Sequence, residues 1–263
     1  MQAKKKNSSV KYIALSVTSV VLFIGIWYLI TEVLKLFPSN VFPSPVKIVK
    51  TFIYKLSNPN PDGGTLFEHI GASLKVALSG YFLALVVGIP LGILMGWSEK
   101  IDMYARPIFD LLRPIPGIAW IPVMLTFFGI GMASKIAVIF LSALIPCIVN
   151  SYTGIKQTRA VHIWVAQTFG ASSRQMLLKI AVPTAMPMIL TSLRVALGSA
   201  WTALVAAELL ASTKGLGFMI QQSRGLTRPD VIIVGMIAIG AIGAFLTYLI
   251  SLLEKAVLKG GRW

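Results

Sequence analysis

The sequence predicts an all-α membrane protein with six transmembrane helices and with its N- and C-termini in the cytoplasm. Hydrophobic residues make up 56% of the 263 residues and charged residues only 13%, whereas a soluble domain carries about 25% charged residues. Six apolar stretches approach the length of about 20 residues that crosses a bilayer as a helix. The segments on one side of these stretches carry more Lys and Arg than those on the other, and such an excess marks the cytoplasmic side. We therefore expect a single transmembrane domain over residues 1–263.

The composition also excludes several function classes. The net charge of +15 does not indicate nucleic-acid binding, because the cations are spread between apolar stretches rather than gathered on one face. The single cysteine, Cys147, excludes a disulfide within the chain. His69 and His162 have no ligand-like neighbours, so no metal site is expected. No nucleophile–base pair is visible either, so an intramembrane enzyme with catalytic residues is not expected.

The expected spans are residues 12–30, 73–97, about 107–129, 135–155, 187–211 and 231–253. The first could be a signal peptide, because Lys4, Lys5 and Lys6 precede it. However, its apolar core is too long for one and no small-residue cleavage site follows. We therefore interpret it as a retained anchor.

The lysines before the first span place the N-terminus in the cytoplasm. An even number of spans returns the C-terminus to the same side. That side then holds Lys100, Arg106, Lys156, Arg159, Arg174, Lys179, Lys255, Lys259 and Arg262. The outer segments also carry cations, among them Lys214, Arg224 and Arg228. The excess of Lys and Arg on the cytoplasmic side is therefore moderate.

The sequence of the outer segment after the first span predicts a short helix. Ser44 is placed to cap a helix that begins at Pro45. Four apolar residues then fall on one face of that helix: Val46, Val49, Ile53 and Leu56. This pattern is typical of a helix lying in the outer membrane interface.

Small residues recur at every fourth position of the second span, at Gly80, Ala84, Gly88, Gly92 and Gly96. Such a stripe lets a neighbouring helix approach closely, which drives helix association in lipid. Pro90 lies on another face and is expected to bend the helix.

The third span contains the stretch RPIPGIAWIP, and Pro114, Pro116 and Pro122 cannot all lie in one straight helix. A broken helix at membrane depth is tolerated where it lines a cavity or is buried in protein. A transport path is therefore one interpretation, and a kink used only for packing is the other.

The cytoplasmic segment 161–183 is predicted to form two short amphipathic helices with a sharp bend between them. Val161, Trp164, Val165 and Phe169 form one apolar stripe, and Gly170 is expected to end that helix in a left-handed conformation. Ser172 or Ser173 can cap the second helix. That helix has Met176, Leu177 and Ile180 on one face, and Pro183 is expected to stop it before the fifth span. The apolar stripe can lie on lipid, pack under the bundle or fill a groove on a partner.

Ionisable residues inside spans are costly and usually face the protein interior or water. Three of them are candidates for a translocation path or for structural pairing: Arg113, Arg194 and Glu208. Pro116, Trp120 and Trp201 complete the candidate path, with Ser142 and Asn150 as weaker candidates.

The cytoplasmic segment resembles the signature of binding-protein-dependent ABC transporter permeases, which reads Glu-Ala-Ala, three residues, Gly, nine residues, Ile, one residue, Leu-Pro. Ala166, Gly170, Ile180 and Pro183 match it at the required spacing. Trp164, Val165 and Val182 replace the Glu, the first Ala and the Leu. The stretches FPSPVKIV, GIPLGILMGW, LRPIPGIAWIPVMLTFFGIG, GASSRQMLLKIAVPTAMPMILTSLRVALGSAW and GLGFMIQQSR are similar to the nitrate, taurine and aliphatic sulfonate branch of this family.

The resemblance implies a type I permease with six spans in a bacterial inner membrane. It implies a dimer of this chain, two cytoplasmic ATPase subunits that bind ATP and Mg, and an extracytoplasmic solute-binding protein. The residues that would dock on the ATPase are Val161, Trp164, Val165, Ala166, Phe169, Gly170, Ile180 and Pro183. The chain itself has no G-x-x-x-x-G-K-[ST] run, so we expect no ATPase activity and no cofactor on it.

The branch implies a small anionic cargo, such as a sulfonate, taurine or nitrate. Arginine side chains or helix N-termini are expected to bind such an anion. Glu208 would repel such a cargo, so pairing with a cation or holding a helix bend suits it better. Other cargoes stay open, namely a pyrimidine precursor, an aromatic acid or bicarbonate. An ion-coupled secondary carrier is the alternative from a different class, but the inverted repeats and paired broken helices that it would need are not clearly present.

Overall fold

The computed structural model describes the backbone of residues 2–260 and the side chains of residues 15–258. The N-terminal lysines, Lys259 and Arg262, which support the predicted topology, lie outside the described side chains. Every regular element in the described part of the chain is a helix, which confirms the predicted all-α class. Two compact units are present. Unit 1 runs to Phe67 and includes Met219–Ile237, and unit 2 comprises Glu68–Phe218 and the residues from Ala238 onward.

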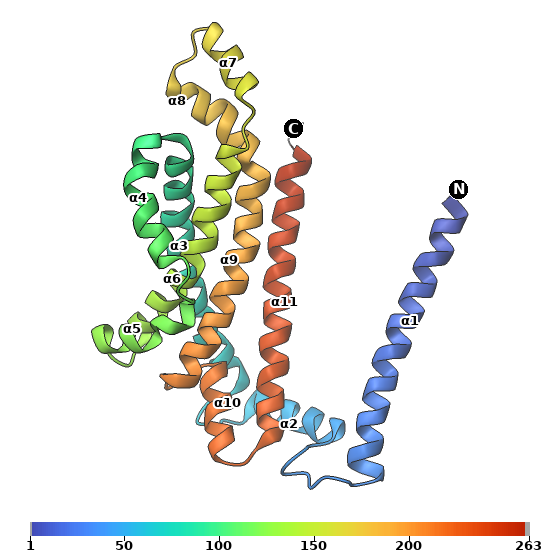
Figure 1. Ribbon diagram of the computed structural model, residues 1–263. Helices are drawn as coiled ribbons and strands as arrows, with labels where there is room; N and C mark the ends of the chain where they lie inside the picture. Colours follow the sequence, from blue (N-terminus) through green and yellow to red (C-terminus); the bar gives the residue numbers. More distant parts are fainter. Residues whose placement is uncertain (1, 261–263) are drawn as a thin grey trace. The chain divides into compact units, whose positions relative to one another are not determined.

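Unit 1 contains a long helix and a short one joined by a turn (Figure 1). Its elements are α1 (Gln2–Tyr28), the π-helical turn η1 (Leu29–Val33), α2 (Pro45–Ser57), most of α10 (Leu216–Gly225) and the first residues of α11 (Pro229–Gly260). As predicted, Ser44 caps α2 by accepting a hydrogen bond from the backbone N–H of Lys47 at 3.3 Å. Trp27 Nε1 donates to the carbonyl of Pro43 at 3.2 Å, which holds the end of α1 beside the start of α2.

The two faces of α2 are inverted relative to a helix of a soluble protein. Ile48, Thr51 and Lys55 are buried, whereas the predicted apolar stripe, represented by Val49 and Ile53, is exposed. The buried polar groups have partners, so they can face the interior without a large cost. An exposed apolar stripe on a helix between two spans fits a position at the surface of the membrane.

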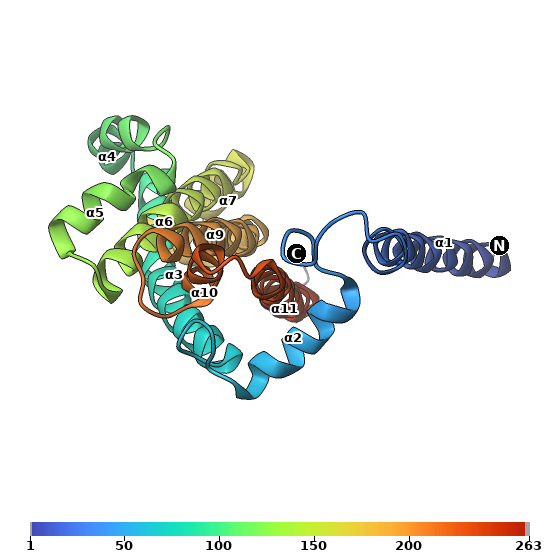
Figure 2. The ribbon, with the colours of Figure 1, turned by 90° about the horizontal axis from the view of Figure 1, so that it is seen from below.

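Unit 2 is a bundle around α3, α6 and α9. Its elements are α3 (Leu66–Trp97), α4 (Glu99–Leu112), the 3₁₀ turn η2 (Gly117–Trp120), α5 (Ile121–Phe128), α6 (Met132–Lys156), α7 (Ala160–Thr168), α8 (Ser173–Met176), the π-helical turn η3 (Leu177–Ala181), α9 (Val182–Leu210) and the later part of α11. Figures 1 and 2 show α6 and α9 side by side, with α5 projecting away from them. The buried core draws on all three central helices, through Tyr81, Ile139 and Leu204.

The stripe of small residues on α3 lies directly against α6. A side-chain carbon added at Gly80 would lie 2.7 Å from Ile139, and one added at Gly92 would lie 2.6 Å from the carbonyl oxygen of Ile148. Gly88 and Gly96 approach α6 equally closely. Because a methyl group cannot fit at these distances, the glycines set the separation of the two backbones.

In the described part of the chain, five helices are long and apolar enough to span a membrane, and a bent pair makes up to six. The bent pair is Glu99–Leu112 with Gly117–Phe128, and its two halves meet at 85°. It occupies the place of the third predicted span, but its first helix begins at Glu99 rather than near Pro107. Pro114 and Pro116 interrupt the helix because neither can donate a backbone hydrogen bond.

The predicted bend after α7 is present. Gly170 adopts a left-handed conformation with φ of +76°. The N–H of Ala171 bonds to the carbonyl of Ala166 at 3.0 Å, which closes the end of α7. Ser172 then caps α8 in a capping box with Gln175.

Two expectations about this half of the chain were wrong. Pro183 does not stop the helix that begins at Ser173, since Ser173–Leu210 forms one continuous candidate span. The π-helical turn Leu177–Ala181 widens the helix just before the proline, and Pro183 then lies in the first turn of α9, where its missing N–H is tolerated. The expected outer loop after the fifth span also contains a helix, α10, whose short glycine-flanked sequence gave no periodic signal.

Candidate functional site

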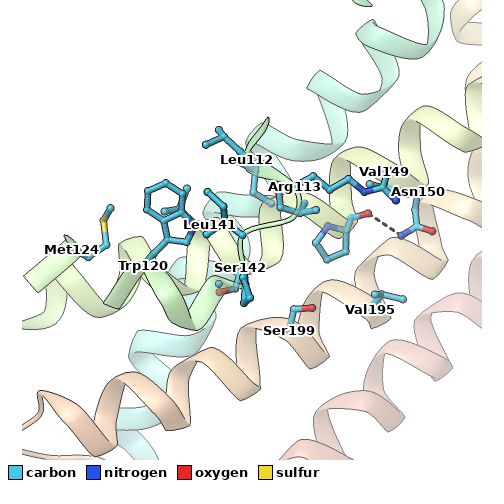
Figure 3. A pocket seen from close by; sticks show the side chains of 16 residues that line it. Leu112, Arg113, Trp120, Met124, Leu141, Ser142, Val149, Asn150, Val195 and Ser199 are labelled. Atoms are coloured by element: carbon cyan, nitrogen blue, oxygen red, sulfur yellow. Dashed lines mark hydrogen bonds between the residues drawn. The ribbon is translucent and has the colours of Figure 1, made fainter. Parts of the chain in front are cut away.

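The break between α4 and α5 borders a cavity of about 600 Å³ in unit 2 (Figure 3). The break, α6 and α9 supply its walls: Leu112, Arg113, Ile115, Pro116, Gly117, Trp120, Met124, Leu141, Ser142, Leu144, Ile145, Pro146, Val149, Asn150, Val195 and Ser199. Most of these side chains are apolar, and a few polar groups lie among them. This composition is typical of a binding cavity for a small molecule.

Arg113 is the cation of this cavity. Figure 3 shows its side chain reaching toward Asn150, with Trp120 and Met124 at the opposite end. Within the described residues, the Arg113 side chain has no ion pair or hydrogen bond. Arg113 also borders a neighbouring cavity of about 320 Å³ toward Asp102 and Arg106. Its five N–H donors are therefore available to an anion from either side.

The other polar groups of the cavity are oriented by their own helix. Asn150 Nδ2 donates to the carbonyl of Pro146 at 2.8 Å, and Ser142 Oγ donates to the carbonyl of Val138 at 2.8 Å. The amide oxygen of Asn150 and the hydroxyl oxygen of Ser142 keep acceptor capacity. Ser142 and Asn150 are the two weaker candidates for the path in the sequence, and both border the cavity.

A second cavity of about 500 Å³ adjoins the first across the break. The two share Pro116, Gly117, Ser142, Val195 and Ser199. Gly117 and the Ser142 side chain are in such close approach that a side-chain carbon at Gly117 would overlap it. The break is therefore held tightly against α6 at the point where the cavities meet.

Arg194 borders the second cavity but is already paired. Its guanidinium forms an ion pair with Glu254 of α11 and lies 3.4 Å from Ser251 Oγ. Trp201 lies away from the cavities, where its Nε1 donates to the carbonyl of Ile239 at 3.2 Å and its ring packs on Gly243. Both residues join α9 to α11.

Glu208 also lies away from the three cavities. Its carboxylate is buried, with 1% of the residue exposed. It accepts hydrogen bonds from Ser73 Oγ and from the N–H of Gly217, each at 2.9 Å. Ser73 Oγ in turn accepts from the N–H of Leu216 at 2.8 Å. The structure therefore places Glu208 where it ties α9 to α3 and to the start of α10, which agrees with the structural alternative for this residue.

The bend between α7 and α8 presents an apolar surface. No residue of α7 is buried. Trp164 is 62% exposed and Phe169, which follows the helix, is 85% exposed. The described part of the chain thus does not cover the stripe under its own bundle. Figure 1 shows this bend and the C-terminal end of α11 at the same end of unit 2.

The remaining residues of the cytoplasmic signature support the bend. Ala166, Ile180 and Pro183 are half-buried, while Val161 and Val165 are exposed beside Trp164. Sequence reasoning missed Ser199 and most of the apolar residues that line the cavity, among them Val195 of α9 and Met124 of α5. Ser199 follows Val195 by four residues in an apolar stretch, and this spacing indicates that the two residues share one face of a helix. Among the described residues, no group of three His, Cys, Asp or Glu side chains could hold a metal ion.

Comparison with known proteins assigns the chain to a family. The family model described as "Binding-protein-dependent transport system inner membrane component" matches residues 88–260. The taurine transport system permease protein TauC of Escherichia coli is 38% identical over 239 residues, which cover 90% of this chain and 85% of that protein. The nitrate import permease protein NrtB of Synechocystis sp. is 36% identical over 220 residues, covering 82% and 80% of the two chains.

A solved structure has the same fold. A chain of the MetNI methionine ABC transporter, in an inward-facing conformation, matches with a TM-score of 0.59 and 19% sequence identity. The match covers 74% of this chain and 95% of that one. The family match over residues 88–260 and the similarity to the permease relatives show that the chain belongs to the binding-protein-dependent transport system inner membrane components, the permeases of ABC importers.

Proposed function

We propose that this chain is the membrane-spanning subunit of an ATP-driven importer for a small oxyanion, such as a sulfonate, taurine or nitrate. The observation that carries the proposal is Arg113, a cation without a partner among the described residues, in the wall of an apolar cavity of about 600 Å³. The two relatives named above are permeases for taurine and for nitrate, and both solutes carry an oxyanion. A guanidinium binds such groups through two parallel N–H donors.

The polar groups around Arg113 can complete the contact with the cargo. Ser199 and Asn150 lie in the same wall, and the Ser199 hydroxyl and the second N–H of the Asn150 amide can donate to an oxyanion. The Ser142 hydroxyl already donates to Val138, so its oxygen suits a cationic group such as the ammonium of taurine. A cargo that fills the cavity would displace water from around Arg113 and so strengthen its attraction to the cation. Arg113 also borders the next cavity, where Asp102 and Asp110 lie beside Arg106. Arg106 is paired with Asp102, so Arg113 is the cation that remains for the cargo.

Energy for transport would come from a separate cytoplasmic ATPase, present in two copies, which holds ATP and Mg. The exposed apolar surface of α7, with Trp164 and Phe169 as anchors, fits a groove on that partner. The helix that begins at Ser173 continues through η3 into α9, and α9 supplies Val195 and Ser199 to the cavity walls. A movement of the bend can therefore reach the cavity through one continuous helix.

The other proposed partners follow from the family. A second copy of this chain would complete the path, and an extracytoplasmic solute-binding protein would deliver the cargo. Membrane lipid surrounds the spans, and no nucleic acid takes part.

Co-purification with the ATPase tests the coupling surface. We expect the pair Trp164→Glu and Phe169→Asp to abolish co-purification in detergent, because it places two carboxylates where apolar anchors must be buried. Gln167→Glu is the matched control, since it adds an acid at an exposed polar position of the same helix and leaves the apolar anchors in place. Retention of the ATPase by the double variant would contradict the proposed docking.

The cargo is tested on the solute-binding partner, by calorimetric titration with sulfonates, nitrate, bicarbonate, aromatic acids and a pyrimidine precursor. Tight binding of a sulfonate or nitrate supports the proposal. Tight binding of the neutral pyrimidine alone would contradict it. Uptake driven by an ion gradient without ATP would favour a secondary carrier instead.

A further inference from the structure

Unit 1 contains a cationic cavity that shares no lining residue with the cavities of unit 2. It has a volume of about 320 Å³. Lys47, Lys50, Thr51 and Tyr54 form one wall, and their spacing of three and four residues places them on one face of α2. Asn60 and Arg228 form the rest.

The loop that carries Asn60 is fixed to α2 by a buried lysine. Lys55 is fully buried, and its Nζ donates to Asp62 Oδ1 at 2.7 Å and to the carbonyl of Gly64 at 2.6 Å. It also lies 3.5 Å from the carbonyl of Asn60. Because the charge of Lys55 is compensated inside the protein, it holds this wall and adds no free charge to the cavity.

The opposite wall is fixed by Asp230, which is 1% exposed. Arg228 donates from Nε and Nη2 to its two carboxylate oxygens at 2.9 and 2.8 Å, and Thr51 Oγ1 donates to Oδ2 at 2.8 Å. These hydrogen bonds with Asp230 raise the pKa of the Arg228 guanidinium. The remaining N–H donors of Arg228 are not used by Asp230.

Two further cations face the same space. Lys50 Nζ has no hydrogen bond or ion pair with any residue that the structure describes, and Lys47 Nζ bonds only to Ser39, at 3.1 Å from its carbonyl. Three cations thus line the cavity, and no carboxylate is among its described lining residues, because the buried Asp230 and Asp62 lie behind the walls and pair with Arg228 and Lys55. Such a cavity is complementary to an anion with several oxygens.

The surface beside the cavity is apolar and exposed. Val49 is 58% exposed and Ile53 is 62% exposed, and Val46 continues the same stripe. α2 connects a span that ends at Val33 to one that begins at Leu66, so it lies at the boundary of lipid and water. A ligand that fits both features has an anionic headgroup and hydrocarbon chains.

We infer that the cavity formed by Lys47, Lys50, Thr51, Tyr54, Asn60 and Arg228 binds the phosphate of an anionic phospholipid in the outer leaflet, with the acyl chains along Val46, Val49 and Ile53. A soluble phosphate has the same headgroup chemistry, but it would make no use of the apolar stripe. The bound lipid would hold α2 and the residue before α11 together. This inference is independent of the cargo and of the ATPase.

Native mass spectrometry of the full-length chain, stripped of lipid in detergent, tests the site. Phosphatidylglycerol and phosphatidylcholine with identical acyl chains are titrated in parallel. We expect phosphatidylglycerol to bind at least tenfold more tightly. Lys50→Gln should weaken phosphatidylglycerol binding about fivefold, the effect of one cation near an anionic headgroup, and Lys50→Arg should retain it.

Lys100→Gln is the matched control, because it removes one exposed lysine outside the cavity, and it should leave lipid binding unchanged. Lys50 is exposed, so an unchanged melting temperature will show that its variant is folded. Equal affinity for the two lipids, or equal effects of the Lys50 and Lys100 substitutions, would overturn the inference. Displacement of phosphatidylglycerol by an equal concentration of inorganic phosphate would overturn it as well, since the ligand would then be a soluble anion.

Discussion

Arg113 and Glu208 both interrupt apolar stretches, yet their surroundings are opposite. Glu208 is buried and accepts hydrogen bonds from Ser73 and Gly217. Arg113 has no such partner among the described residues and borders two cavities. A charge that is satisfied within the protein stabilises the fold, whereas an unsatisfied one at a cavity is available to a ligand.

For Arg113 we predict that Arg113→Gln lowers uptake of the anionic cargo at least about tenfold in kcat/KM, because hydrogen bonds to a charged group contribute about 1.5–3 kcal/mol. Arg113→Lys should retain part of the rate, as it keeps the charge and loses the two-point contact. Arg224→Gln, an exposed arginine of α10, is the control. Equal uptake by the wild type and by Arg113→Gln in reconstituted vesicles would show that Arg113 does not bind the cargo during transport.

For Glu208 we predict a stability effect. Glu208→Ala should destabilise the protein by about 3 kcal/mol, because it leaves the buried Ser73 hydroxyl and Gly217 N–H without an acceptor. Glu99→Ala is the control, since Glu99 is exposed in the first turn of α4 and contributes about 0.5 kcal/mol there. Thermal unfolding in detergent measures both. Similar melting temperatures for the two variants would contradict the anchoring role.

At the scale of elements, two kinds of helix interruption have different consequences. Pro114 and Pro116 separate α4 from α5 and produce a bend of 85° beside the cavities. Pro183 produces no such break, because the helix widens into a π-helical turn just before it and continues directly into α9. The first interruption shapes the cavity, and the second keeps the bend at Gly170 connected to α9.

The fit of the break against α6 gives a further prediction. Gly117→Ala should destabilise the protein by about 1–3 kcal/mol, because the added methyl group overlaps Ser142. Gly25→Ala is the matched control, since open space surrounds Gly25 in α1. The midpoint of thermal unfolding in detergent checks the pair. A stable Gly117→Ala variant would show that the break can move away from α6 at little cost.

Features set by local chemistry could be predicted from the sequence. The cap at Ser44, the left-handed Gly170 and the small-residue stripe from Gly80 to Gly96 each depend on a few neighbouring residues. The position of Glu208 could not be predicted, because it is decided by Ser73 and Gly217 from other elements. The helix α10 and the cavity residue Ser199 were missed for the same reason, as tertiary packing defines them.

At the scale of the whole molecule, two distant features of unit 2 are connected by one helix. The apolar bend around Trp164 and Phe169 is continuous, through Ser173–Leu210, with the cavity wall at Ser199. A partner that moves the bend therefore moves one side of the cavity. This continuity explains why a chain without an ATP-binding motif can take part in ATP-driven transport.

Uptake of labelled taurine into proteoliposomes, with the ATPase and the solute-binding protein present, tests this claim most directly. We predict that uptake requires ATP and continues after ionophores collapse the ion gradients. It should be lost in the Trp164→Glu and Phe169→Asp double variant and kept in Gln167→Glu. Full uptake without ATP, or full uptake by the double variant, would contradict the account.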